Sequence, residues 1–208
     1  LVSAHGGLSR SDLAARTGLA RPTVSRLTQE LIEAGLVVEQ ISVADGSPGR
    51  PGRPLFPASR AVVGIGLEVN VDHVAGAAID LLGETVDSFV LPIDGVTMSS
   101  TEVLDLLGAR LRAMVEALTQ LGTKEISGIT LAVPSVIDGD GKRVIYASNL
   151  EWRDLVPYDV LKTYLPDGVP FVVDNDANVQ ALATASLIST SDAPLDSFLY
   201  VFGEYGIG

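Results

Sequence analysis

Amide and carboxylate side chains cluster where a predicted buried strand meets a predicted helix, in Val173-Asp174-Asn175-Asp176-Ala177-Asn178. Ligands of α/β proteins bind beside the carboxyl ends of strands, which is where this cluster falls. Asn175 offers a donor and an acceptor beside the acceptor-only carboxylate of Asp176, a pair that suits the adjacent hydroxyls of a polyol. In an enzyme, Asp176 could also take the proton of an attacking hydroxyl. Asn and Asp also cap helix N-termini, so this second interpretation stays open.

A second group of chemically capable side chains lies on a helix predicted to begin at Arg21-Pro22 and to end at Gly35. Arginine and short polar side chains at the start of a helix read base edges and phosphates in the DNA major groove. The helix is predicted to bury an apolar stripe of Val24, Leu27, Leu31 and Ala34. The candidate DNA contacts off that stripe or at its edge are Arg21, Thr23, Ser25, Arg26 and Gln29.

A preceding helix is predicted to start at the capping box Ser9-Arg10-Ser11-Asp12 and to run to Thr17. Gly18 makes the turn, and Leu19 is predicted to pack inward, which gives a helix-turn-helix. A small helical packing module is the alternative.

A strand over Leu36–Val43 is predicted to follow the two helices. Beyond it, Arg50 and Arg53 stand on extended Pro/Gly backbone and could follow a narrow minor groove. The alternative is a linker whose arginines are only solvated.

The distribution of charge also differs between the first 60 residues and the rest of the chain. Residues 1–60 hold seven arginines against five carboxylates, whereas residues 61–208 hold seven basic residues against 21 acidic ones. A weakly basic head on an acidic body favours contact of a polyanion with the head alone, although sixty residues are few enough for chance to do the same.

Composition excludes several classes of protein. The chain has no cysteine, no signal-peptide pattern and no apolar run of the ~18 residues that a membrane span needs. We therefore expect a cytoplasmic protein with no membrane partner and no metal or cofactor bound by these residues.

The remaining pattern alternates strands with helices and predicts an α/β fold with a mixed sheet. The Gly/Pro-rich segment Asp45–Pro57 divides the chain into a head, residues 1–57, and a body, residues 58–208. Leu1 is not a start methionine and Gly208 falls within a loop, so we expect a part of a longer protein, incomplete at the C-terminus. The predicted strands of the body are Val62–Leu67, Val74–Ile79, Thr85–Leu91, Gly128–Val133, Arg143–Tyr146, Pro170–Val173 and Ser197–Phe202, and its predicted helices are Thr101–Leu121, Tyr158–Tyr164 and Ala177–Leu187.

The stretch Ser9–Leu36, SRSDLAARTGLARPTVSRLTQELIEAGL, resembles winged helix-turn-helix repressors. One departure is Ala20, where the second helix usually has a Ser or Thr cap. Its absence weakens the helix start by ~1 kcal/mol.

The body resembles the ROK family (repressors, open reading frames and sugar kinases), within the actin-like ATPase fold. Ala132–Asp138, Ala147–Trp152 and Asp174–Asn178 are similar to the family patterns VPGxVD, xxNLxxW and ENDAN, with Ser135 for Gly and Asp174 for Glu. The resemblance implies that Asn175 and Asp176 contact a sugar, and that loops carrying Ser135, Ser148 and Asn149 line the same pocket. It also implies a cysteine-rich zinc motif and further sugar-contacting Glu and His residues beyond Gly208.

Family kinases carry a first phosphate loop similar to DxGGTK, where this chain has Glu68-Val69-Asn70-Val71-Asp72-His73. A second loop, GTGxGGG, is replaced by Gly203-Glu204-Tyr205-Gly206-Ile207-Gly208. Both changes remove glycines and add a carboxylate where phosphates must bind, which argues against phosphoryl transfer.

The sequence therefore predicts a sugar-responsive, DNA-binding transcriptional regulator, a repressor of carbohydrate genes with a non-phosphorylating, kinase-like body. Its expected partners are operator DNA, a sugar or sugar phosphate effector, and a second copy of itself in a homodimer or higher oligomer. One alternative is an active ROK sugar kinase fused to a DNA-binding head, with Asp176 as its catalytic base. Another is a regulator that responds to a protein partner through a vestigial pocket.

Overall fold

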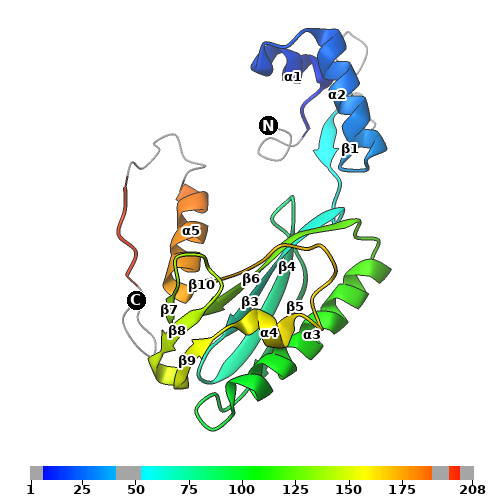
Figure 1. Ribbon diagram of the computed structural model, residues 1–208. Helices are drawn as coiled ribbons and strands as arrows, with labels where there is room; N and C mark the ends of the chain where they lie inside the picture. The colour runs from blue at the N-terminus through cyan, green and yellow to red at the C-terminus, as the bar shows by residue number, and fades with distance from the viewer. Residues whose placement is uncertain (1–6, 41–52, 189–196, 202–208) are drawn as a thin grey trace.

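The computed structural model describes residues 7–40, 53–188 and 197–201. Within these residues a small head, coloured blue to cyan, stands on a larger α/β body (Figure 1). The head contains the helices α1 (Arg10–Thr17) and α2 (Arg21–Glu33) and an antiparallel pair of strands, β1 (Val37–Glu39) and β2 (Leu55–Pro57). The predicted winged helix-turn-helix is confirmed. The predicted strand Leu36–Val43 begins one residue later and ends at Glu39, and its residues 41–43 lie outside the described part.

Local hydrogen bonds set the ends of the two helices. Ser9 Oγ accepts from Asp12 N at 3.2 Å while Asp12 Oδ2 accepts from Ser9 N at 2.9 Å, which completes the predicted capping box. The hydroxyl and the amide of Ser9 lower the pKa of Asp12 below its ordinary value. Gly18 ends α1 with a φ of 70°, and Ala20 starts α2 without a side-chain cap.

The buried face of α2 is not the predicted one. Val24 is buried as predicted, and Thr28 is buried beside it. The spacing allows two apolar stripes through Val24, and the small cluster formed with β1 and β2 covers the one through Thr28. The residues that were predicted to be buried but are exposed are Leu19 (45%), Leu27 (38%), Leu31 (41%) and Ala34.

The body is built on a mixed sheet with the strand order β10-β6-β3-β4-β5. The strands β3 (Val62–Val69), β6 (Glu125–Val133) and β10 (Phe171–Asn175) are parallel, whereas β4 (His73–Asp80) and β5 (Thr85–Pro92) continue the sheet in antiparallel order. The predicted mixed sheet is therefore confirmed. The carboxyl ends of the three parallel strands meet at one edge, which is where α/β proteins place their ligands.

Helix α3 (Ser100–Gln120) covers one face of this sheet (Figure 1). Its side chains at three- and four-residue spacing are buried and pack against alternate residues of β3. Helix α5 (Asp176–Ile188) contacts β10 and β6. The buried partners are Val103, Leu107, Leu111, Met114 and Leu118 on α3, and Val63, Ile65, Leu67 and Val69 on β3.

A second, antiparallel sheet follows β6 and contains β7 (Val136–Ile137), β8 (Val144–Ala147) and β9 (Trp152–Leu155). A 3₁₀ turn, η1 (Ser148–Leu150), connects β8 to β9, and α4 (Pro157–Leu161) comes after β9. Only β8 and α4 were predicted, since the short β7 and β9 show no clear hydrophobic period. Helix α4 is also shorter than the predicted Tyr158–Tyr164.

The predicted strand Ser197–Phe202 is wrong for its described part, because residues 197–201 join none of the sheets. Leu199 is 88% exposed, so the alternating apolar residues here do not face a core. The segment is held instead by Tyr200 OH, which donates to Gln180 Oε1 of α5 at 2.7 Å.

Asp80, at the end of β4, joins the segment after the head to the body. Asp80 is 7% exposed, and its carboxylate accepts hydrogen bonds from Arg60 N (3.0 Å), Ser59 Oγ (3.2 Å), Leu82 N (2.8 Å) and Glu84 N (3.1 Å). Burial raises the pKa of Asp80, but these hydrogen bonds outweigh it and leave the pKa below its ordinary value. One carboxylate thus holds both the β4–β5 hairpin turn and the chain leaving the head.

Asp80→Asn should lower the free energy of unfolding by roughly 1–3 kcal/mol at neutral pH, because an amide nitrogen cannot accept these bonds. The folded-state pKa is lowered, so the contribution of the carboxylate is present above its ordinary pKa and is lost as pH falls through the lowered value. Urea denaturation at about pH 7 and about pH 3 should therefore show a difference from wild type that shrinks in acid. The control is Asp87→Asn, because Asp87 accepts from a neighbouring backbone amide, Ser88 N, at 2.9 Å. An equal difference at both pH values would contradict the role of the charge.

Candidate functional site

The predicted DNA-reading side chains lie on the outer side of α2. Arg21, Ser25, Arg26 and Gln29 are exposed, and Thr23 is half-buried. Their three- and four-residue spacing keeps them on neighbouring positions of the helix surface. This surface offers guanidinium, hydroxyl and amide groups to a DNA groove.

Two of these side chains are bound to carboxylates one turn further along α2. Arg26 Nη1 donates to Glu30 Oε1 at 2.5 Å, and Gln29 Nε2 donates to Glu33 Oε1 at 3.0 Å. The Arg26 and Glu30 side chains are 64% and 55% exposed, so such a pair contributes only about 0.3–0.5 kcal/mol. Contacts to DNA can replace bonds of this strength.

The antiparallel pair β1 and β2, with the residues between these two strands, forms the wing of the head. Glu39 on β1 connects this wing to α1 through ion pairs. Arg53 Nη1 lies 3.5 Å from Glu39 Oε2, and Arg10 of α1 forms an ion pair with the same carboxylate. The Arg53 side chain remains 65% exposed. Arg50 lies outside the described residues.

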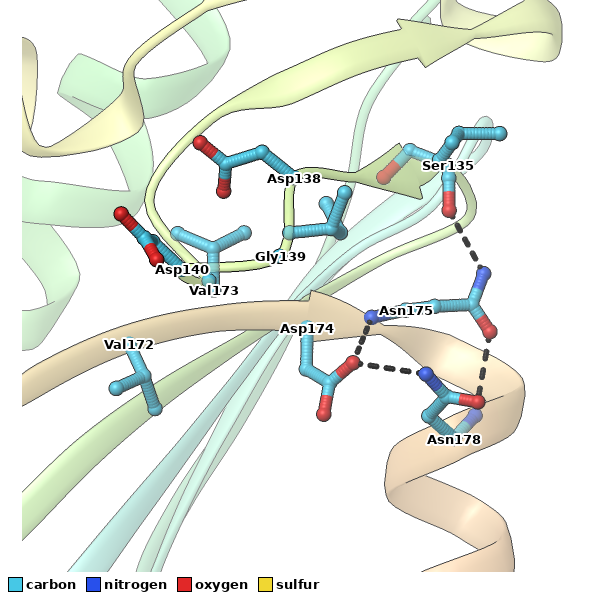
Figure 2. A pocket seen from close by; sticks show the side chains of 12 residues that line it. Ser135, Asp138, Gly139, Asp140, Val172, Val173, Asp174, Asn175 and Asn178 are labelled. Carbon is cyan, nitrogen blue, oxygen red and sulfur yellow. Dashed lines mark hydrogen bonds between the residues drawn. The ribbon is translucent and has the colours of Figure 1, made fainter.

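A cavity of about 600 Å³ lies beside β10 (Figure 2). It is formed by the segment that follows β6, the hairpin between β7 and β8, and the junction of β10 with α5. The described residues that line it include no Lys, Arg or His. Its polar lining consists of Ser135, Asp138, Asp140, Asp174, Asn175 and Asn178.

Asn175 joins two sides of this cavity, as Figure 2 shows. Its Nδ2 donates to Ser135 O at 2.9 Å, and its Oδ1 accepts from Asn178 N at 3.2 Å in the first turn of α5. Asp174 Oδ1 accepts from Asn175 N at 2.7 Å and from Asn178 Nδ2 at 3.0 Å. Asn175 therefore caps α5 and also lines the cavity, so the two interpretations of this residue are compatible.

Asp176 lines a different cavity of about 320 Å³, together with Glu68 of β3 and Gln180 of α5. The linings of the two cavities share no residue. Neighbouring residues separate here because β10 ends at Asn175 and α5 begins at Asp176, where the backbone changes direction. Glu68 alternates with the buried side chains of β3, so this second cavity lies on the sheet face opposite α3.

The structure brings together two of the five predicted sugar-contacting residues, Ser135 and Asn175. Asp176 follows Asn175 directly but lines the other cavity. Ser148 and Asn149 lie in η1 and line neither cavity.

The hairpin between β7 and β8 contributes carboxylates that the sequence analysis did not assign to the site. Asp138 and Asp140 line the cavity, and the backbone of β10 donates a hydrogen bond to Gly141 O at 2.9 Å. Asp138 Oδ1 accepts from Lys142 N (2.9 Å) and Arg143 N (3.1 Å), and these bonds lower the pKa of Asp138. The alternation Asp-Gly-Asp-Gly over 138–141 is the signal that could have located this turn.

The β3–β4 turn occupies the place of the first phosphate loop. Asn70 is 5% exposed, and its Oδ1 accepts from Val71 N at 2.7 Å. Asn70 N donates to His73 O at 2.9 Å, and Val71 O accepts from Gly95 N at 2.8 Å. Backbone amides that a phosphate loop directs at its ligand are here bonded within the protein.

His73 stands at the end of this turn between two carboxylates. Its Nδ1 lies 2.6 Å from Asp72 Oδ1, and its Nε2 lies 3.7 Å from Glu68 Oε1. The turn therefore presents negative charge where a triphosphate would need positive charge.

Among the described residues, the His, Asp and Glu side chains include no group of three that could hold a metal ion. No helix in the described ranges is long and apolar enough to cross a membrane. The cysteine-rich zinc motif that the resemblance implies belongs beyond Gly208, and residues 1–208 contain no cysteine to form one.

The head and the body together define a helix-turn-helix joined to an actin-like, kinase-related domain. A family model described as ROK family matches residues 64–208, and one described as MarR family matches residues 1–46. The chain belongs to the ROK family.

Two curated relatives match along nearly the whole chain. It is 29% identical over 208 residues to the putative xylose repressor of Caldicellulosiruptor sp. (strain Rt8B.4), covering 98% of this chain and 49% of that protein. It is 28% identical over 202 residues to the xylose repressor of Bacillus subtilis (strain 168), covering 97% of this chain and 50% of that protein. The chain spans about half the length of these relatives.

A solved ROK family transcriptional regulator, described as a homologue of the E. coli MLC protein, has the same fold. It superimposes with a TM-score of 0.56 at 22% identity, covering 86% of this chain and 44% of that one.

Asn175→Asp should lower the free energy of unfolding by roughly 1–3 kcal/mol, because it puts a carboxylate oxygen where a donor faces Ser135 O. Urea denaturation measures the loss. Gln180→Glu is a matched control on α5, since Glu keeps the oxygen that accepts from Tyr200 OH. If both variants unfold at the same urea concentration as wild type, Asn175 does not hold the two sides of the cavity together.

Proposed function

We propose that this protein is a sugar-responsive transcriptional regulator, a repressor of carbohydrate genes whose body binds a sugar without phosphorylating it. The observation that carries the proposal is the exposed polar and arginine-bearing side of α2, on a helix-turn-helix joined to a ROK-family body. Two relatives named as xylose repressors support this function.

The head reads operator DNA through α2. Arg21, Ser25, Arg26 and Gln29, with the half-buried Thr23 at the edge, contact base edges and phosphates in the major groove. Arg53 and Arg50 of the wing follow the neighbouring minor groove, where Arg53 exchanges its ion pair with Glu39 for DNA. One helix reads only a half-site, so the regulator binds a two-fold operator as a homodimer. Sedimentation measures this stoichiometry. The regulator acts in the cytoplasm.

The effector is a neutral sugar rather than a sugar phosphate. Among the described residues, the larger cavity is lined by the carboxylates of Asp138, Asp140 and Asp174 and by no basic side chain. Lys142 and Arg143, which follow the lining, offset part of this charge, and the remaining negative charge favours a neutral ligand over a phosphate. Carboxylates and amides are the acceptors and donors that sugar hydroxyls need. We propose that Asn175 and Ser135 contact the sugar at this cavity, and that Asp176, the residue after Asn175, contacts it from the second cavity. Ser148 and Asn149, which lie outside both linings, contribute only if η1 moves toward the sugar.

The second candidate function is a sugar kinase fused to a DNA-binding head. We consider it because the ROK family includes kinases. The internal hydrogen bonds of the β3–β4 turn and the carboxylates beside His73 favour the regulator instead. The second phosphate-loop segment, residues 203–208, lies outside the described residues.

One experiment separates these functions. Wild-type protein is used to select sequences from a randomised DNA pool, and calorimetry is run with D-xylose, D-glucose and their phosphates. ATP consumption is then measured with each sugar. Selection of a two-fold DNA sequence, binding of a neutral sugar and no ATP turnover are expected, whereas sugar-dependent turnover would identify a kinase.

Arg26→Ala should weaken binding to the selected DNA by about 1–3 kcal/mol, with most of the loss at one base position, if its guanidinium reads a base edge. Fluorescence anisotropy across single-base variants of the site measures this. Arg153→Ala is the control, because Arg153 stacks on Tyr146 of the body at 4.3 Å. A uniform loss on all sequences with a shallower salt dependence would show that Arg26 contacts phosphate instead.

Asp176→Asn should weaken sugar binding by roughly 1–3 kcal/mol, because it replaces an acceptor for a sugar hydroxyl by a donor. DNA affinity without sugar should stay near wild type, since the pocket acts on the head only through the equilibrium that sugar shifts. The variant should therefore repress normally and resist induction in a reporter assay, whereas the exposed Asp159→Asn of α4 should behave like wild type. Normal induction of Asp176→Asn would remove Asp176 from the sugar site.

A further inference from the structure

A lysine of the body reaches the end of the DNA-reading helix. Lys124 directly precedes β6, and its Nζ donates to Ala34 O at 3.2 Å. Ala34 is the C-cap of α2. A Cβ on the next residue, Gly35, would lie 1.8 Å from Lys124 Nζ, so a side chain there would displace the flexible end of this lysine. Gly35 also has a φ of 70°, which favours glycine.

The contact between Lys124 and Ala34 is electrostatically favourable. The C-terminus of a helix carries partial negative charge and free carbonyl oxygens, and a nearby cation stabilises it. The last turn of α2 has no basic residue and instead contains Glu30 and Glu33. The ammonium of Lys124 supplies, from the body, the positive charge that the last turn of α2 lacks.

The backbone on either side of this contact is anchored. Lys124 N donates to Ala61 O at 2.9 Å, and Ala58 N donates to Leu36 O at 2.8 Å. The end of α2, the chain leaving the wing and the start of β6 are therefore bonded to one another. In Figure 1 the head stands over the end of the sheet at which β6 begins.

The opposite end of β6 leads to the larger cavity. Strand β6 has nine residues, a length of about 30 Å, and ends at Val133, two residues before Ser135. Asn175 Nδ2 holds Ser135 O, so a sugar hydroxyl that binds Asn175 competes for the amide that anchors this end. Near its start, β6 is irregular where it pairs with β3 at Val63 and Gly64, and such irregularities redirect neighbouring side chains.

We propose that Lys124 is a positioning residue: it holds the C-terminus of α2 for DNA reading, and β6 carries the effect of sugar binding from Ser135 and Asn175 to this hold. The second half of the inference rests on the function proposed above. Lys124 is exposed, so water can replace its ammonium at Ala34 O. Sugar binding can therefore shift the equilibrium between the bonded and the released lysine.

Amide hydrogen exchange of the full chain tests the hold on α2 without DNA or sugar. Gly35 N donates to Ile32 O and Leu36 N donates to Leu31 O, both at 2.9 Å, so these amides report on the end of the helix. In Lys124→Met they should exchange about two- to tenfold faster than in wild type, while amides of α3 stay unchanged. Lys124→Arg, which keeps the charge and the donor, should restore wild-type exchange.

The matched control is Lys162→Met, which removes the same charge from an exposed lysine at the C-cap of α4 in the body. Its Gly35 and Leu36 amides should exchange as in wild type. Wild-type exchange in Lys124→Met, or an equal acceleration in Lys162→Met, overturns the positioning role.

D-xylose, and D-glucose in parallel, test the link along β6. A sugar that calorimetry shows to bind should accelerate exchange of Gly35 and Leu36 in wild type and add nothing in Lys124→Met. No acceleration in wild type, or the same acceleration in both proteins, overturns the link. If calorimetry detects no sugar, the proposed function fails by itself, and the Lys124 variants still decide whether this residue holds α2.

Discussion

The parallel pairing of β3, β6 and β10 is the constraint on which the positions of the candidate residues depend. Strands that run in one direction end at one edge, so Asn70 and Ser135, which follow β3 and β6, lie at the same side of the sheet as Asn175, the last residue of β10. Burial of alternate β3 residues against α3 determines which side chains face the core, because a slip of one residue would exchange the two faces. Residues that never touch a ligand therefore set the geometry of the cavities.

The body was predictable from the sequence where one hydrophobic period is unambiguous. The apolar residues of α3 form a single stripe, so its predicted span differs from the observed one by one residue at each end. In α2 the spacing fits two stripes through Val24, and packing against β1 and β2, which local periodicity does not contain, selects the one through Thr28. The segment around Leu199 has the composition of a strand, but pairing requires a neighbouring strand that sequence pattern does not specify.

The sequence predicted which strand ends form the candidate site, but not which side chains line each cavity. Motif resemblance pointed to the ends of β6 and β10, and the structure places Ser135 and Asn175 together there. The motif resemblance could not show that Asp176 lines another cavity. Side-chain direction turns by ~180° per residue in a strand and by ~100° in a helix, and the change from strand to helix falls between Asn175 and Asp176. The carboxylate of Asp140 was missed for a related reason, since the hairpin between β7 and β8 joins β10 through the backbone of Gly141.

The β3–β4 turn differs from a glycine-rich phosphate loop in where its backbone amides are directed. Glycines in a phosphate loop leave backbone amides open to a ligand. Asn70 instead supplies an oxygen that accepts from Val71 N, and its buried side chain keeps that bond away from water. Restoring a phosphate site would require removal of this internal acceptor and of the carboxylates of Asp72 and Glu68 beside His73. The acceptor-rich cavity beside β10 lies apart from this turn, so its capacity to bind hydroxyl groups does not depend on these changes.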